Sequence, residues 1–328
     1  METNKQSMSV GRFLTDWGVL ACIVLFMIVF SISAPAEFCT LSNMVTILQS
    51  ISITTVIAMG ATFTFAVDIF DLSFASIATI GAALSVTFVV WDGIPLPFAL
   101  LLTVLACMFI GVINSFVVTK LHIPSFLATL AMSFILDGLE LTYSGGSLIS
   151  STMPGAAGQQ IVMQMPDFFQ NFGRQPLIII IMVVSVILVQ ILLGMTKHGR
   201  FMYMVGANKE AARLSGVKVN LYKALAFILT GVFSAIGGIM IASRAGTVQA
   251  GAGSSFLMPA IAAVAIGQTF AGIGKSNAVG TFVGAALIGV VENGLYALSF
   301  PYYSIDIVKG LILLLALFMS NYTSKQSN

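Results

Sequence analysis

The chain has 328 residues, of which 58% are hydrophobic and only 8% are charged, and its formal net charge is +2. Ordinary globular proteins carry about 25% charged residues, so this composition excludes a typical soluble domain and indicates an integral membrane protein. The basic residues are interleaved with apolar runs and form no continuous patch, so nothing in the sequence favours a nucleic-acid partner.

A helix needs about 20 apolar residues to cross roughly 30 Å of hydrocarbon. The apolar runs, taken in chain order, predict an all-α polytopic protein that forms a single membrane domain over residues 1–328. We expect ten transmembrane helices, at residues 17–34, 45–67, 74–91, 98–119, 124–142, 177–195, 222–243, 257–273, 278–298 and 304–320.

The distribution of basic residues predicts the orientation of these helices. With the N-terminus in the cytoplasm, eleven lysines and arginines fall on the cytoplasmic side and two, Arg174 and Arg244, on the outer side. This is the bias that the positive-inside rule describes. We therefore expect cytoplasmic N- and C-termini and an outer excursion over Tyr143–Pro176.

The loop 196–223 is the long internal segment densest in charge, with six basic residues and one acid, Glu210. Asn208 is a typical helix N-cap, Glu210 would lie in the first turn and Arg213 near the end, while Gly216 suits a left-handed stop. These features predict a short helix over residues 209–215 outside the membrane. Two interpretations stay open: a solvated turn, or a helix that contacts a soluble partner.

Polar residues within or between the apolar runs are candidates for function, because charge in hydrocarbon is costly unless it is paired or hydrated. Asp68, Asp71 and Ser73 lie where the second predicted span meets the third. Two ionised carboxylates three residues apart would repel each other on a helix, so we expect a helix break. The break either lines a translocation pathway or is an ordinary polar turn.

Four further acidic residues are predicted inside or at the ends of spans. Asp137 and Glu140 either line a hydrated path or mark the outer mouth of the fifth span. Asp306 and Lys309, three residues apart, are expected to form a structural ion pair. Glu292 has no obvious partner and, with Asn293, is a second candidate for the pathway.

Signals for an enzyme are weak. The two histidines, His122 and His198, cannot build a zinc site by themselves, and Gly272–Ser276 lacks the first glycine of a phosphate-binding loop. We therefore expect no catalytic residue and no cofactor bound by this chain. A short similarity between 111–114 and 289–293 suggests an inverted repeat, although chance explains a match of this length equally well. Gly280 and Gly284 are spaced for close helix packing.

Several segments together resemble the permease subunits of ribose-type bacterial ABC importers, a group that includes ribose, xylose, galactose and autoinducer-2 systems. The segments are 199–201 with 206–216, 71–73, 123–130, 259–263, 280–281, 293–295 and 309–310, and the resemblance extends over about residues 45–316. The chain departs from the family in three places. Members often have two glycines followed by Ile-Asp-Leu-Ser where this chain has residues 67–73, an arginine where Asp137 stands, and acidic residues near Leu257 and Pro259.

The resemblance implies a permease in the bacterial inner membrane that carries a sugar or sugar-like solute. It also implies a second permease copy or paralogue, a periplasmic or lipid-anchored sugar-binding protein, and cytoplasmic ATPase subunits that hold the ATP and Mg²⁺. Contact with the ATPase would fall on a coupling helix, and the residues that match it are Arg200, Asn208, Lys209, Glu210, Ala211, Ala212, Arg213 and Gly216. The alternative is an ion-coupled secondary transporter, in which Asp68, Asp71 or Glu292 binds the driving ion.

Overall fold

A computed structural model describes residues 10–150, 152–154, 160–162, 165–270, 274–301, 304–305, 307–311 and 314. The helices are α1 (Val10–Ser33), α2 (Pro35–Phe38), α3 (Leu41–Ala66), α4 (Phe74–Val86), α5 (Leu96–Thr119), α6 (Ser125–Ser144), α7 (Asp167–Asn171), α8 (Leu177–Gln190), α9 (Lys197–Ala207), α10 (Lys209–Leu214), α11 (Val219–Ala245), α12 (Leu257–Thr269) and α13 (Ala278–Ala297). Single π-helical turns extend α4 to Trp91 and α8 to Met195, and a short 3₁₀ turn, Ser254–Phe256, precedes α12.

The predicted all-α membrane fold is confirmed. In the described part of the chain, seven helical segments are long and apolar enough to cross a membrane, and each coincides with a predicted span: 41–66, 74–91, 96–119, 125–144, 177–195, 219–245 and 278–297. The apolar parts of two further helices, 17–33 and 254–269, are shorter. α12 has only 13 residues, about 20 Å of helix, so it is shorter than the predicted span 257–273. Most of the tenth predicted span lies outside the described residues.

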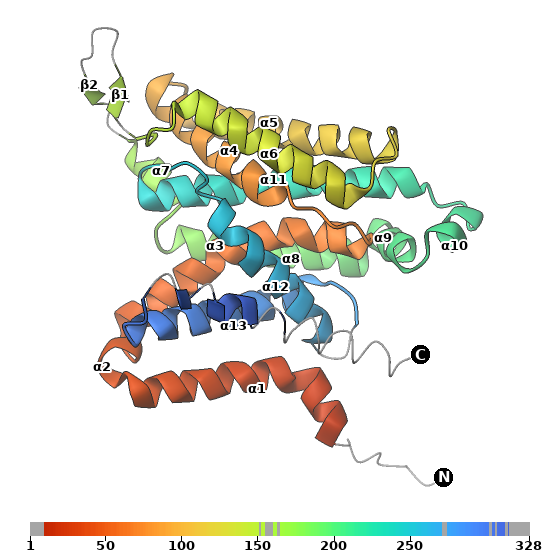
Figure 1. Ribbon diagram of the computed structural model, residues 1–328, viewed down its shortest axis with the longest axis horizontal. Coiled ribbons are helices and arrows are strands. Elements are labelled where there is room, and N and C mark those ends of the chain that lie inside the picture. The colour runs from red at the N-terminus through yellow and green to blue at the C-terminus, as the bar shows by residue number, and fades with distance from the viewer. Residues whose placement is uncertain are drawn as a thin grey trace.

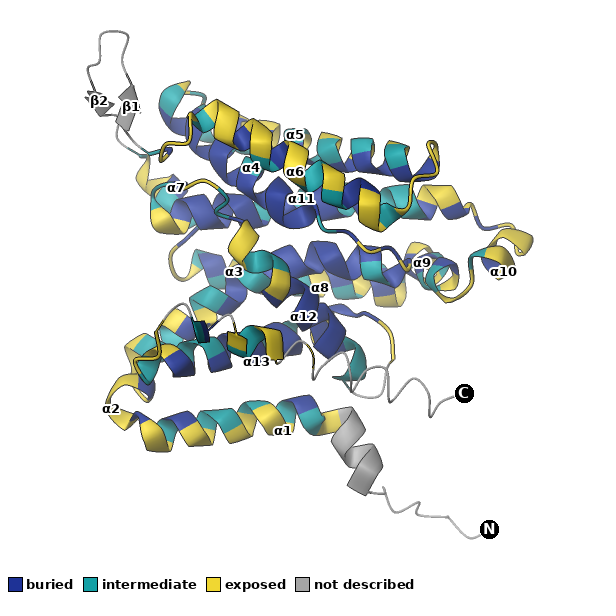
Figure 2. Cartoon of the chain, in the orientation of Figure 1, coloured by how far each residue is buried: buried dark blue, intermediate teal, exposed yellow. Residues whose placement is uncertain are grey.

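Figure 1 shows how the helices are arranged, and Figure 2 shows that they differ in how far they are buried within the chain. In an apolar 18-residue stretch of each helix, the share of residues that are buried is 78% for α4 with its extension, 72% for α13, 67% for α11 and 61% for α3, whereas it is 22% for α5 and for α6. α3, α4, α11 and α13 therefore form the centre of the bundle. The large exposed apolar side chains of α5 and α6, such as Phe109 and Phe134, face outward, as expected for helices that meet lipid or another chain.

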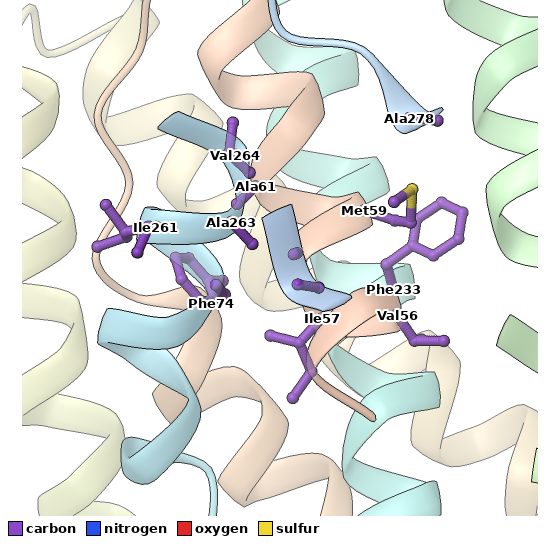
Figure 3. Packing of buried hydrophobic residues seen from close by; sticks show 14 of the residues in the cluster. Val56, Ile57, Met59, Ala61, Phe74, Phe233, Ile261, Ala263, Val264 and Ala278 are labelled. Carbon is purple, nitrogen blue, oxygen red and sulfur yellow. The ribbon is translucent and has the colours of Figure 1, made fainter. Parts of the chain in front are cut away.

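The core is packed with aliphatic and aromatic side chains from several helices, among them α3, α4, α11, α12 and α13 (Figure 3). Ile57 and Met59 of α3 and Phe233 of α11 belong to one buried cluster, which continues through Val264 of α12 to Ala278 at the start of α13. α12 and α13 approach so closely that a Cβ atom on Gly280 would collide with the backbone of Gly267. The close packing predicted from the glycine spacing is confirmed at this pair of helices.

The connecting segments gather at the two ends of the bundle (Figure 1). α9 and α10, which come from the charged loop 196–223, lie at one end. α2, α7 and the antiparallel hairpin β1 (Thr152–Pro154) and β2 (Gln160–Val162) lie at the other. The loop 196–223 and the excursion 143–176 therefore lie at opposite ends of the bundle, as their predicted placement on opposite sides of a membrane requires.

Candidate coupling site

The short helix predicted in the charged loop is present as α10. The Asn208 side chain accepts hydrogen bonds from the backbone N–H groups of Glu210 and Ala211, each at 3.0 Å. The helix ends at Gly216, whose φ of +80° is left-handed, and the N–H of Val217 donates to the Ala212 carbonyl at 3.0 Å. This is a Schellman ending, so the predicted cap and the predicted glycine stop are both confirmed.

Most of α10 faces away from the bundle. Ala212 is buried, whereas Glu210, Ala211 and Arg213 are exposed, and so are Asn208, Gly216 and, on α9, Arg200. Glu210 and Arg213 form an exposed ion pair at 3.4 Å, which contributes little to stability. Sequence reasoning missed Leu214, whose side chain is 89% exposed. An isolated leucine at the end of a short polar helix was the available signal.

The predicted helix break between the second and third spans is also confirmed. α3 ends at Ala66 and α4 begins at Phe74, and the segment 67–73 between them is not helical. Asp68 adopts a left-handed φ of +54°. Its carboxylate accepts a bond from the Nζ of Lys209 at 2.8 Å, so it faces α10. The structure therefore connects one candidate pathway residue with one candidate coupling residue, 141 positions apart.

Asp71 and Ser73 lie deeper, in a buried polar cluster. One oxygen of the Asp71 carboxylate accepts bonds from the backbone N–H and the hydroxyl of Ser73, at 2.8 and 2.7 Å. Asn114 of α5 donates to the Ser73 hydroxyl at 2.7 Å, and the Leu72 N–H donates to the Thr129 hydroxyl of α6 at 3.1 Å. Burial raises the pKa of Asp71, which lies between the two spanning helices, to about 6. These bonds join the break to α5 and α6.

A cavity of about 590 Å³ opens between the break, α9 and the segment after α12. Asp68, Phe70, Tyr203, Gln268 and Lys275 are among its lining residues. The hydroxyl of Tyr203 donates to the Ser276 carbonyl at 2.8 Å, which fixes one wall. Aromatic faces beside carboxylate, amide and ammonium groups suit a small polar solute. Asp71 and Ser73 are buried and do not line this cavity.

Glu292 and Asn293 lie far from the break. Asn43, in the first turn of α3, donates to the Asn293 side chain at 2.8 Å, whereas Asp68 follows the last turn of the same helix. α3 has 26 residues and is therefore about 39 Å long, so the five candidate pathway residues do not form one site. No partner for Glu292 was obvious from the sequence, and in the structure its carboxylate lies 2.9 Å from the Nζ of Lys309. Asp306, the partner expected for Lys309, lies outside the described residues.

Glu140 is a second buried acid, near the end of α6. Its side chain is buried, and neither carboxylate oxygen has a hydrogen-bond partner among the described residues. One oxygen of Asp137 is in the same condition. Glu140 lies in the last part of α6, and both interpretations of this pair, a hydrated path and the outer mouth of the span, stay open.

The fold and the site define an α-helical membrane transport protein. A short capped helix, α10, is fixed at one end of its bundle and exposes most of its side chains. The chain belongs to the family described as "Branched-chain amino acid transport system / permease component", whose model matches residues 43–317. It is similar to the ribose import permease protein RbsC of Haemophilus influenzae, with 30% identity over 98% of both chains. Identity to RbsC of Escherichia coli K12 is 32%, over 96% of this chain and 98% of the relative.

More distant similarities agree with this family. The xylose transport system permease protein XylH of Escherichia coli K12 is 28% identical over 94% of this chain and 92% of its own length. A solved structure, described as a metal-chelate-type ABC transporter in an inward-facing conformation, aligns with a TM-score of 0.54. It covers 93% of this chain and 98% of that chain, but at 14% identity the likeness concerns the fold alone.

Proposed function

We propose that this chain is the transmembrane subunit of an ATP-driven ABC importer in a bacterial inner membrane, and that it moves a sugar or sugar-like solute. Its N- and C-termini lie in the cytoplasm. A periplasmic or lipid-anchored binding protein delivers the solute, and a second permease copy or paralogue completes the membrane part. ATP and Mg²⁺ bind to separate ATPase subunits, and this chain is not catalytic.

The observation that carries the coupling role is the geometry of α10. It is a capped helix at the end of the bundle, with Glu210, Arg213 and Leu214 facing outward. The Leu214 side chain, on a helix outside the apolar spans, is 89% exposed and is therefore left almost uncovered by the described part of its own chain. An apolar side chain flanked by two charges is the composition expected of a small helix that inserts into a groove of a soluble partner. We therefore assign α10 to the contact with the ATPase.

The proposed substrate class rests on the relatives, which are named as ribose and xylose permeases. The lining of the 590 Å³ cavity is compatible with a small polar solute. The ion-coupled alternative is not supported by any of these similarities. Moreover, Asp68 and Glu292, two of its three candidate ion ligands, are each paired with a lysine.

The test is reconstitution of the full chain with the ATPase and binding-protein products of neighbouring genes. Ribose and xylose serve as probes. We expect ATPase activity that rises when the loaded binding protein is added, together with ATP-dependent uptake of one probe. Uptake driven by an ion gradient in vesicles that contain no ATPase would refute the importer.

The contribution of α10 needs a separate variant. Glu210→Lys combined with Arg213→Glu reverses the two exposed charges of the ion pair on α10. We expect this variant to hydrolyse ATP without taking up solute. The matched control is Lys218→Gln, which changes an exposed charge of the same loop outside α10. Unchanged uptake in the charge-reversed variant would contradict a coupling role for α10.

A further inference from the structure

We propose that Asp68 is a positioning residue for the coupling helix: through Lys209 it fixes α10 to the end of α3 and so links α10 to the buried cluster around Asp71 and Ser73. The inference rests on the proposed function, because it assigns a device within the importer. Its first basis is the 2.8 Å contact between the Asp68 carboxylate and the Lys209 ammonium.

The backbone at Asp68 favours glycine. The N–H of Asp68 donates to the Phe65 carbonyl and the N–H of Ile69 donates to the Thr64 carbonyl, at 3.2 and 2.9 Å. This pattern is a Schellman ending of α3 with Asp68 at its left-handed position, which glycine occupies most easily. Aspartate is less common than glycine at such a position, and here its carboxylate accepts the bond from Lys209.

A second contact holds the loop 196–223 against the end of α3. A Cβ atom on Gly206, near the end of α9, would collide with the carbonyl oxygen of Ala66 and would lie 3.4 Å from the N–H nitrogen of Asp68. The end of α9 is therefore in direct backbone contact with the end of α3. Lys209 follows three residues later, so the Asp68–Lys209 bond holds the first turn of α10 against a support that is already in place.

From Asp68 the chain continues directly into the buried bonds of the break. Leu72 is held by Thr129 of α6, and Ser73 by Asn114 of α5. A displacement of α10 that preserves the bond to Asp68 must therefore pull on bonds to α5 and α6. A displacement that breaks the bond no longer pulls on those helices through this segment. The ion pair is thus one route by which movement of α10 reaches α5 and α6.

The test compares Asp68→Gly with the wild type in the full reconstituted importer. Glycine fits the left-handed backbone, so this variant removes the carboxylate without straining the fold, and its thermal stability should be at least that of the wild type. Because both partners are partly exposed, at 70% and 40%, the ion pair is weak, and we expect uptake per ATP hydrolysed to fall about two- to fivefold. Lys218→Gln, which removes an exposed charge of the same loop and is charge-matched to the Lys209→Gln variant described next, should retain the wild-type ratio.

Two further variants separate the ion pair from a general charge effect. Lys209→Gln should also lower the ratio. The double variant Asp68→Gly with Lys209→Gln should fall no further than the more affected single variant, because the two side chains act as one unit. A wild-type ratio in Asp68→Gly, or a double variant whose loss is the product of the two single losses, would overturn the proposal.

Hydrogen exchange on the purified full chain in nanodiscs tests the positioning without any ATPase. In Asp68→Gly the backbone amides of residues 211–217 should exchange about two- to fivefold faster, while those buried in α11 stay unchanged. Unchanged exchange at 211–217 overturns the positioning role. If the wild-type importer shows no stimulated ATPase, the proposed function fails, and this exchange result alone decides the role of Asp68.

Discussion

Replacing Asn208 by alanine removes both hydrogen bonds that begin α10, each 3.0 Å long. Loss of such a cap costs about 0.5–2 kcal/mol, which raises the unfolded fraction of α10 roughly two- to thirtyfold. A helix of six residues has little other support, since isolated helices shorter than about 12 residues are marginal in water. We therefore expect α10 to be unfolded for part of the time in Asn208→Ala. Uptake per ATP hydrolysed should fall in proportion to the fraction of molecules in which α10 is unfolded.

The assay pairs hydrogen exchange of α10 with uptake and ATPase activity of the reconstituted importer. Asn208→Asp is the matched control, because its carboxylate still accepts the two N–H groups and suits the positive end of the helix. It should behave like the wild type in both measurements. Faster exchange in Asn208→Ala together with an unchanged uptake ratio would refute the idea that α10 must be helical to couple.

Three predictions concern the bundle itself, measured as thermal unfolding of the purified chain in detergent. Gly280→Ala should destabilise by about 1–3 kcal/mol through collision with α12, whereas Gly138→Ala, where an added Cβ meets nothing within 4 Å, should be neutral or stabilising; equal effects would contradict the close contact. Burial raises the pKa of Asp71 from 3.8 to about 6, so the native state holds the carboxyl proton to higher pH than the unfolded chain does. The free energy of unfolding should therefore fall by roughly 3 kcal/mol as the pH rises from about 4 to 6, and then level off. Asp71→Asn should abolish this pH dependence. Glu292→Gln should cost about 1–3 kcal/mol, because the carboxylate is largely shielded from solvent and faces Lys309, and a double-mutant cycle with Lys309→Gln should show coupling between the two.

Features with a local cause could be predicted from the sequence. The cap at Asn208, the stop at Gly216 and the break between Asp68 and Ser73 each depend on residues within a few positions of one another. The close approach at Gly280 also follows from the local spacing of Gly280 and Gly284. A helix surface without side chains lets another helix approach closely, whichever part of the chain that helix belongs to. These elements therefore appear where the sequence predicts them.

Partners distant in the chain could not be predicted in the same way. Lys209 is the partner of Asp68 across 141 positions, and Asn43 is the partner of Asn293 across 250. Helical spacing predicts Asp306, three residues away, as the partner of Lys309. It gives no information about Glu292, which lies on another helix. For the same reason the sequence could not show that the two groups of candidate pathway residues lie at opposite ends of α3.

The unequal burial of the helices indicates which of them would move if α10 were displaced. The ion pair joins α10 to Asp68 at the end of α3, a central helix, and the buried bonds of the break then reach Asn114 on α5 and Thr129 on α6. α5 packs closely against the central helix α11, where a Cβ atom on Gly111 or Gly231 would collide with the backbone of the facing helix. In an apolar 18-residue stretch of each helix, 22% of the residues of α6 are buried, against 61% for α3, so displacing α6 breaks fewer internal apolar contacts. A pull transmitted from α10 would therefore shift α6 before it disturbed the central helices. The break between α3 and α4 is thus the point at which a force on the loop turns into a movement of α6.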